Sequence, residues 1–402
     1  MTVHVIGAGL AGLAAAVRLS EYNQPVVVYE AAAHGGGRCR SFHDDTLGRR
    51  IDNGNHLLLS GNAEAMAYVR AIGSMGSLDI QNPPVFPFLD LESAERWQVR
   101  PRLGLVPGGS LLDYLSVLKL AWASENASVA DVVGPARPLF RKFWQPLCVS
   151  VLNTLPEEAA ARLLWPVLKQ TFGRGASACR PCIARQGLSE SFIDPALAVL
   201  EQRGARVHFN QRLRQLHFSD ERAGALSFAD VEIALAEDDT VILAVPAEAA
   251  ATLVPDLNPP DKFRAIVNGH FLLPGRHEDI SFLGLVGGLS QWLFVRGDVA
   301  SVTVSAADDV AGESSENIAK TLWAEVSAAL HLKGAPLGRY RIIKEKRATI
   351  AQTPEQVRRR SPTRTRWGNL VLAGDWTQAG LPATIEGAIT SGHRAADALR
   401  GR

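Results

Sequence analysis

A glycine-rich motif near the start of the chain limits the possible folds more than any other feature. It reads Gly7-Ala8-Gly9-Leu10-Ala11-Gly12 and lies between an apolar run at 3–6 and a helical pattern at 10–20. Gly7 permits a tight turn, Gly9 leaves room for a pyrophosphate to approach the backbone, and Gly12 lets helix and strand pack closely. The amides of Leu10 and Ala11 open the helix, whose partial positive charge favours phosphate.

An acidic residue completes this signature. Glu30 ends a second apolar run at 26–29 and follows Gly12 by 18 residues, so its carboxylate is placed to accept hydrogen bonds from ribose hydroxyls. Strand, glycine turn, helix, strand and acid occur in this order, which predicts a Rossmann-like α/β domain that binds a dinucleotide. The alternative is a plain turn with a surface charge, and the ordered set disfavours it.

Two further segments carry glycines that suit a cofactor. Gly35-Gly36-Gly37-Arg38 follows Glu30 closely. Its glycines allow a second approach of the backbone, and Arg38 is suited to pair with a pyrophosphate oxygen. Near the other end of the chain, Gly374-Asp375 leads to Pro382-Ala383-Thr384-Ile385. Pro382 suits the first turn of a helix that extends to about residue 399, and its free amides are further donors for an anionic group.

Together these segments resemble the two flavin signatures of the amine-oxidase flavoproteins, a family that includes monoamine oxidase, protoporphyrinogen oxidase and phytoene desaturase. The resemblance implies FAD as the cofactor and a Rossmann-like FAD-binding domain with an inserted α+β substrate domain. It also implies that Asp375 binds the ribityl chain and that amides near Thr384 face the isoalloxazine or the pyrophosphate. The backbone at Leu213 would contact the adenine side. For Asp375, helix capping is the alternative.

Length and apolar runs predict two interleaved domains. A chain of 402 residues exceeds one ordinary core, and 47% hydrophobic with 21% charged residues is typical of a globular protein. Further strands are expected at 206–209, 213–218, 240–245 and 369–373. We expect the FAD-binding domain to comprise residues 1–60, 186–260 and 363–402, and the substrate-binding domain to comprise residues 61–185 and 261–362.

Three internal stretches narrow the resemblance. They are residues 51–59, 143–147 and 344–349, which read IDNGNHLLL, FWQPL and KEKRAT. With the flavin signatures they resemble the hydroxysqualene dehydroxylases of bacterial hopanoid synthesis, also called squalene-associated FAD-dependent desaturases. This resemblance implies reductive removal of an allylic hydroxyl from a C30 isoprenoid to give squalene, with hydride passing from N5 of the reduced flavin to carbon.

Three other functions stay open at this point. An oxidative desaturase of a carotenoid precursor needs the same long, apolar and dry pocket. An amine oxidase is disfavoured, because no paired aromatic residues accompany Trp376 near the C-terminal signature. A flavin-binding scaffold without activity needs only the cofactor motifs.

His56 is the first candidate for the proton donor, which this reaction needs because hydroxide is a poor leaving group. Imidazole has an ordinary pKa of about 6.5, which suits a general acid near neutral pH. The alternative is that His56 only hydrogen-bonds a carbonyl. Asp52 is the second candidate acid, although Asp before Asn-Gly often forms a turn. By resemblance, Gly54 and Asn55 pass close to the isoalloxazine. Arg347 holds either a pyrophosphate or, as we favour, a structural carboxylate.

The remaining features concern partners and location. The net charge of +1 gives no reason to expect a nucleic-acid partner, and neither a metal site nor a second dinucleotide motif for an electron donor is predicted. Cys179 and Cys182 have redox spacing but are interpreted as ordinary thiols of a cytoplasmic protein. No signal peptide or membrane span is expected. Apolar and basic residues at 111–122 and 140–152 leave peripheral contact with the inner face of the cytoplasmic membrane open, against a buried helix pair.

Overall fold

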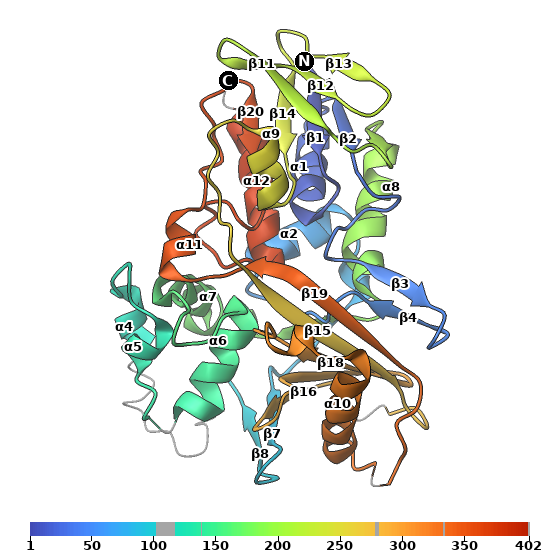
Figure 1. The fold of residues 1–402 in the computed structure, drawn as a ribbon, viewed down its shortest axis with the longest axis vertical. Helices are drawn as coiled ribbons and strands as arrows, with labels where there is room; N and C mark the ends of the chain where they lie inside the picture. Colours follow the sequence, from blue (N-terminus) through green and yellow to red (C-terminus); the bar gives the residue numbers. More distant parts are fainter. Residues whose placement is uncertain (102–116, 138, 278–280, 333, 401–402) are drawn as a thin grey trace.

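A parallel sheet of five strands occupies one end of the molecule (Figure 1). The computed structural model describes residues 1–101, 117–137, 139–277, 281–332 and 334–400. The strands, in spatial order, are β10 (Arg206–His208), β2 (Val26–Tyr29), β1 (Val3–Ile6), β14 (Thr240–Leu243) and β20 (Leu370–Leu372). The apolar runs of β2, β1, β14 and β20 are buried throughout, as expected for a parallel sheet that is covered on both faces.

Helices cover one face of this sheet, and a small antiparallel sheet covers the other. The first face carries α1 (Leu10–Ser20), α8 (Asp194–Gln202) and α12 (Ile385–Arg400). The second carries β11 (Gln215–Ser219), β12 (Arg222–Ser227), β13 (Glu232–Ala234) and α9 (Ala247–Leu253). Helices α1 and α12 lie so close that a Cβ on Gly392 would be 2.1 Å from the Ala11 carbonyl oxygen.

Most predicted elements of this half are confirmed, although several of their boundaries differ by one to three residues. The predictions for β1, α1 and β2 have the observed bounds. The strand predicted from residue 213 begins at Gln215, so Leu213 lies in the preceding connection. The last helix begins at Ile385 instead of Pro382, because Thr384 is its N-cap and its hydroxyl accepts a hydrogen bond from the Gly387 amide (3.1 Å).

A second, seven-stranded sheet occupies the other end of the molecule (Figure 1). Its spatial order is β19 (Tyr340–Ile350), β15 (Phe263–Leu272), β18 (Val299–Val304), β17 (Trp292–Arg296), β16 (Phe282–Val286), β7 (Phe86–Asp90) and β8 (Arg96–Val99). Along β16, Leu283 faces α10 (Ser315–Ala329), whereas Phe282 and Val286 face a cluster of shorter helices. Alternate residues of one strand therefore enter two separate cores.

The shorter helices include residues from both stretches of mixed apolar and basic side chains, 111–122 and 140–152. Four of them are α4 (Val117–Ala121), α5 (Val129–Val133), α6 (Gln145–Leu152) and α7 (Leu164–Gln170). A π-helical turn at Phe140–Trp144 leads into α6, so residues 140–152 are helical, with Trp144 and Leu152 buried. The part of the other stretch at 111–116 lies outside the described residues. Over the described part of the chain, every helix is too short or too polar to cross a bilayer.

Smaller elements connect the two ends. They are β3 (Ser41–Asp44), β4 (Arg49–Asp52), β5 (Leu58–Leu59), β6 (Leu78–Ile80), β9 (Pro181–Ala184), α2 (Ala63–Ala71) and α11 (Pro354–Arg358). Single turns occur at Met75–Ser77, Ala161–Leu163, Phe172–Arg174, Ala176–Ala178, Ser189–Ile193 and Val310–Gly312. The domain boundaries stated above stay predictions.

Candidate functional site

The glycine motif follows β1 at the carboxyl edge of the parallel sheet. Gly7 has a φ of +106°, and a Cβ there would lie 2.5 Å from the Ala244 carbonyl oxygen, so only glycine fits this turn. A Cβ on Gly12 would lie 1.9 Å from the Gly7 carbonyl oxygen. Gly9 differs, because a Cβ there would meet nothing within 4 Å. Open space in front of Gly9 and the N-terminus of α1 fits a pyrophosphate.

Glu30 follows β2 at the same edge. Its carboxylate accepts hydrogen bonds from the amides of Ala8 and Ala32, both at 2.8 Å. These two bonds orient the carboxylate, and each oxygen keeps a lone pair for a ribose hydroxyl. The geometry fits the ribose contact expected from the sequence.

The second glycine segment packs directly on the first. The Gly36 amide donates to the Ala8 carbonyl oxygen (2.8 Å), and Gly36 and Gly9 form a parallel bridge. A Cβ on Gly37 would lie 3.7 Å from the Gly9 Cα, and both Gly36 and Gly37 have positive φ. Two glycine segments therefore line one space, as a close backbone approach to a cofactor requires.

Arg38 joins the N-terminal and C-terminal signatures. Its guanidinium donates to the Asp375 carboxylate (2.7 Å) and to the Ala348 carbonyl oxygen (2.6 Å). We expected Arg38 to hold a pyrophosphate oxygen; its main partner in the structure is Asp375, and the other guanidinium N–H groups are left for a phosphate. Asp375 is buried and does not cap α12, so the helix-capping alternative is wrong.

The segment before α12 is held from behind. The Ala383 amide donates to the Gln352 side-chain oxygen (2.8 Å), and the Leu381 carbonyl accepts from Arg360 (2.6 Å). Among the described residues, nothing accepts from the amides of Ile385 and Glu386. The amides that stay available to a cofactor are therefore those of Ile385 and Glu386, whereas the Ala383 amide already donates to Gln352. Gln352 and Arg360 belong to no recognisable motif, so they could not be identified from the sequence alone.

Residues Asn53 to Asn55 are anchored on the seven-stranded sheet. The side-chain amide nitrogen of Asn55 donates to the Thr303 hydroxyl (3.1 Å), and that hydroxyl donates to the side-chain oxygen of Asn268 (2.9 Å). Asn268 in turn donates to the Asn53 carbonyl oxygen (3.2 Å), and a Cβ on Gly54 would lie 3.3 Å from Asn268. Buried Asn268 and Thr303 thus fix the backbone on either side of Gly54.

His56 follows this anchored segment. Its side chain is accessible and has no hydrogen-bond partner among the described residues, so the alternative of a carbonyl-bound ring finds no support. Surrounding protein displaces water and lowers the pKa of His56; the Asp52 carboxylate opposes this shift and Arg38 adds to it. The accessible ring of His56 therefore directly follows the anchored segment Asn53–Asn55.

Asp52 is held as a hydrogen-bond acceptor. One carboxylate oxygen accepts from the Ser41 hydroxyl (2.5 Å) and the Leu188 amide (2.9 Å), and the other accepts from Arg296 (2.9 Å). The side chain is buried at the end of β4. A carboxylate with these three donors is poorly placed to release a proton, so the geometry favours His56 over Asp52 as the acid.

Three minor sequence interpretations are also settled by geometry. Arg347 pairs with the Glu248 carboxylate (2.5 Å), which agrees with the expectation that its partner is a structural carboxylate. Cys179 and Cys182 are free and buried, and burial raises their pKa values to about 12 and about 11, which does not suit a redox pair. Trp376 is buried, with its ring N–H bonded to the Val245 carbonyl oxygen (2.9 Å), so it belongs to the core.

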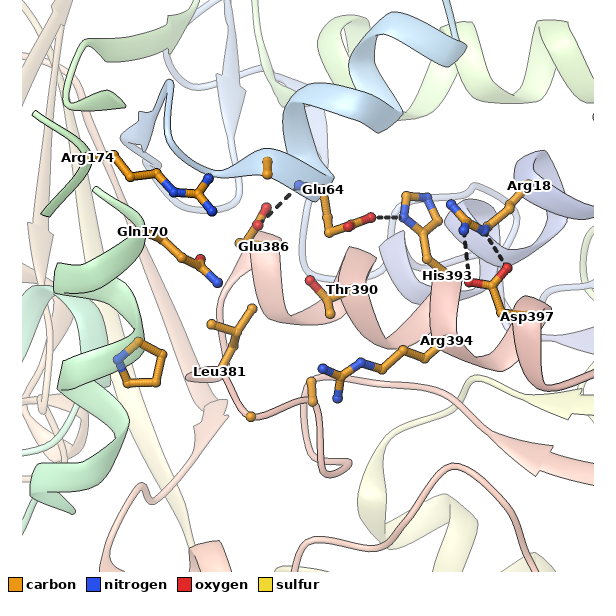
Figure 2. Close-up of a pocket in the computed structure, with 14 residues that line it drawn as sticks. Arg18, Glu64, Gln170, Arg174, Leu381, Glu386, Thr390, His393, Arg394 and Asp397 are labelled. Carbon is orange, nitrogen blue, oxygen red and sulfur yellow. Dashed lines mark hydrogen bonds and ion pairs between the residues drawn. The ribbon is translucent and has the colours of Figure 1, made fainter. Parts of the chain in front are cut away.

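A polar cavity of about 430 Å³ lies between α1, α2, α7 and α12 (Figure 2). Glu386 projects from α12 and accepts hydrogen bonds from the Glu64 and Ala65 amides at the start of α2. His393 pairs with Glu64 (2.5 Å), and Arg18 pairs with Asp397 (2.8 Å). This charged lining does not suit a hydrocarbon.

Comparison with known proteins agrees with the arrangement of the segments that are expected to bind FAD. The model of the family "Flavin containing amine oxidoreductase" matches residues 10–274 and 295–400. A hydroxysqualene dehydroxylase of Zymomonas mobilis is 43% identical over 405 residues, covering 98% of both chains. One of Sinorhizobium fredii is 44% identical, covering 98% of this chain and 97% of its own. This chain belongs to the hydroxysqualene dehydroxylase family.

Proteins that are named for other activities are less similar to this chain. A probable zeta-carotene desaturase of Synechococcus elongatus is 23% identical over 99% of this chain and 98% of its own. A solved structure described as a putative protoporphyrinogen oxidase from Exiguobacterium has a TM-score of 0.71 at 15% identity, covering 100% of this chain and 99% of its own. Membership in the hydroxysqualene dehydroxylase family makes this protein an FAD-dependent oxidoreductase with an amine-oxidase-like fold.

Proposed function

We propose that this protein removes the hydroxyl group of hydroxysqualene to give squalene in hopanoid or related isoprenoid synthesis. Support comes from relatives named hydroxysqualene dehydroxylase at 43% and 44% identity, against 23% for the carotenoid desaturase. When bound, reduced FAD supplies the hydride. The balance is one hydride, which the anionic reduced flavin (FADH⁻) would supply, and one proton: the C–O bond breaks, the oxygen leaves as water with that proton, and the hydride forms the C–H bond, leaving oxidised FAD.

The single structural observation that carries the mechanism is the position of His56. The ring has no hydrogen-bond partner among the described residues, adjoins the anchored Asn53–Asn55 segment, and lies within electrostatic reach of both Arg38 and Asp52. In the imidazolium form, a ring nitrogen of His56 donates its proton to the departing hydroxyl oxygen. Asp52, held by Arg296, stabilises that charged form without giving up a proton itself.

Apolar surroundings next to His56 fit a hydrocarbon substrate. Leu57 and Leu59 lie within three residues after it and pack against the buried cluster that contains Phe143. An apolar wall keeps water from the allylic cation that develops when the hydroxyl leaves. The substrate proposed here is therefore a hydrophobic C30 isoprenoid, with its hydroxyl near His56.

Incubation with the two classes of substrate distinguishes this function from that of an oxidative carotenoid desaturase. Photoreduced enzyme, kept anaerobic, should convert hydroxysqualene to squalene, whereas oxidised enzyme should leave phytoene and zeta-carotene unchanged. Products are measured by mass spectrometry. Dehydrogenation of either carotenoid by the oxidised enzyme, with no squalene from the reduced enzyme, would reverse the assignment.

We also propose that α4 contacts the inner face of the cytoplasmic membrane, where a water-insoluble substrate resides. Leu118 is 48% and Trp122 is 80% exposed, and Lys119 between them is exposed as well. Helix α4 and the residue that follows it thus expose two large apolar side chains and a cation, which suits an anionic lipid surface.

The double variant Leu118→Ser with Trp122→Ser should bind vesicles of phosphatidylcholine and phosphatidylglycerol at least about tenfold more weakly, because each apolar side chain contributes about 1.5–3 kcal/mol when buried. Cosedimentation measures this. Val231→Ser removes an apolar side chain that is 49% exposed near β13, and it should bind like the unsubstituted protein. Equal binding by all three proteins would rule out contact through α4.

A further inference from the structure

Arg360 is a buried cation that forms no ion pair with a carboxylate among the residues that the structure describes. It follows α11 and is 3% exposed. Its guanidinium donates to the Leu381 carbonyl oxygen (2.6 Å) and to the Gln352 side-chain oxygen (3.0 Å), both uncharged acceptors. The Nε atom is buried and has no hydrogen-bond partner in the part of the chain that the structure describes.

The surrounding charges leave this cation undercompensated. Burial lowers the pKa of Arg360 to about 10, and the negative charge that opposes the shift is Asp375. Asp375 is already paired with Arg38 at 2.7 Å. A charge taken out of water is costly unless an opposite charge accompanies it. The missing negative charge at Arg360 is consistent with an anionic group that binds nearby.

Gln352 extends the contacts of Arg360 to both sides of the site. Its side-chain oxygen accepts from Arg360 and from the Ala383 amide, and its side-chain nitrogen donates to the Leu152 carbonyl oxygen (2.7 Å) at the end of α6. Gln352 is completely buried. Together the two side chains connect α6, on the substrate side, with the segment that leads into α12.

We propose that Arg360 is a positioning residue that, with Gln352, fixes the Leu381–Ala383 backbone and supplies the positive charge that favours the reduced, anionic form of FAD. This inference rests on the placement of FAD against the first turn of α12, and it adds a determinant of the cofactor's reduction potential. Its consequence is that the protein sets how readily FAD holds the electron pair used in the reaction.

The test is the two-electron midpoint potential of the bound flavin, measured by dye-coupled spectral titration without substrate. Arg360→Gln should lower the equilibrium ratio of reduced to oxidised flavin at least tenfold at a fixed potential, which is about 30 mV for a two-electron couple. Arg360→Lys keeps the charge and should recover most of that loss. Arg359→Gln is the matched control, because the neighbouring Arg359 pairs with Asp261 (2.5 Å), and it should leave the potential unchanged.

An unchanged potential in Arg360→Gln would overturn the proposal. If that variant does not fold, Gln352→Glu decides, since it places a carboxylate against Arg360 and cancels its charge while the arginine remains. A lower potential in Gln352→Glu supports the proposal, and an unchanged one overturns it. Because no substrate is present, either result leaves the proposed dehydroxylation to be judged separately.

Discussion

Replacing His56 by glutamine should leave FAD bound and slow turnover of hydroxysqualene by about 10²–10⁴-fold. Glutamine fills similar space but has no acidic proton, so the hydroxyl would have to leave without proton transfer. The ring has no hydrogen bond to lose among the described residues, so the fold should tolerate the change. Turnover is measured with the flavin reduced beforehand, and the visible spectrum of the variant confirms cofactor content.

If His56 is the acid, the turnover rate depends on pH in a definite direction. Protein around the ring lowers the pKa of His56, so the imidazolium form is lost as pH rises through a value below about 6.5. The rate should therefore fall with rising pH in that range, and His56→Gln should show no such limb. Asp52→Asn removes a charge that raises the pKa of His56, so it should move the limb to lower pH. A normal rate in His56→Gln would transfer the acid role to another group or to water.

Glu30→Ala should give a largely colourless protein whose affinity for FAD is weaker by about 10²–10⁴-fold. Two ribose hydrogen bonds to a charged acceptor account for this loss, at about 1.5–3 kcal/mol each. The variant also leaves the Ala8 and Ala32 amides without their present acceptor, which loosens the turn that faces the pyrophosphate. Quenching of flavin fluorescence on titration gives the dissociation constant.

Glu248→Ala is the control for this prediction. Glu248 is also an acid near the sheet, but its partner is the exposed side chain of Arg347. Its removal should leave FAD affinity within about twofold, since surface ion pairs contribute about 0–1 kcal/mol. A yellow Glu30→Ala protein with the affinity of the unsubstituted chain would contradict the ribose contact.

Local patterns made much of the cofactor half predictable. The apolar runs at β1 and β2 and the glycines before α1 encode a βαβ unit with contacts close in sequence, and their predicted bounds match the structure. The start of α12 was missed by three residues. Pro382 suggested a first helical turn, whereas the hydroxyl of Thr384 provides the cap.

Long-range pairing was not predictable from the same patterns. Arg38 and Asp375 are 337 residues apart, and each was assigned a separate contact with the cofactor, although they bond to each other. Gln352 and Arg360 lie in a segment without a recognisable motif, and they bond to the end of α6 and to the segment before α12, which are far away in the sequence. Such contacts follow from tertiary packing, which a single sequence encodes only weakly.

A single-turnover experiment tests whether reduced FAD in this protein converts hydroxysqualene to squalene. Enzyme with stoichiometrically reduced FAD is mixed anaerobically with excess hydroxysqualene, and flavin absorbance and squalene are followed together. We expect one squalene to form for each flavin reoxidised, with equal rates for the two signals. Flavin that stays reduced, or that reoxidises without forming squalene, would contradict this expectation.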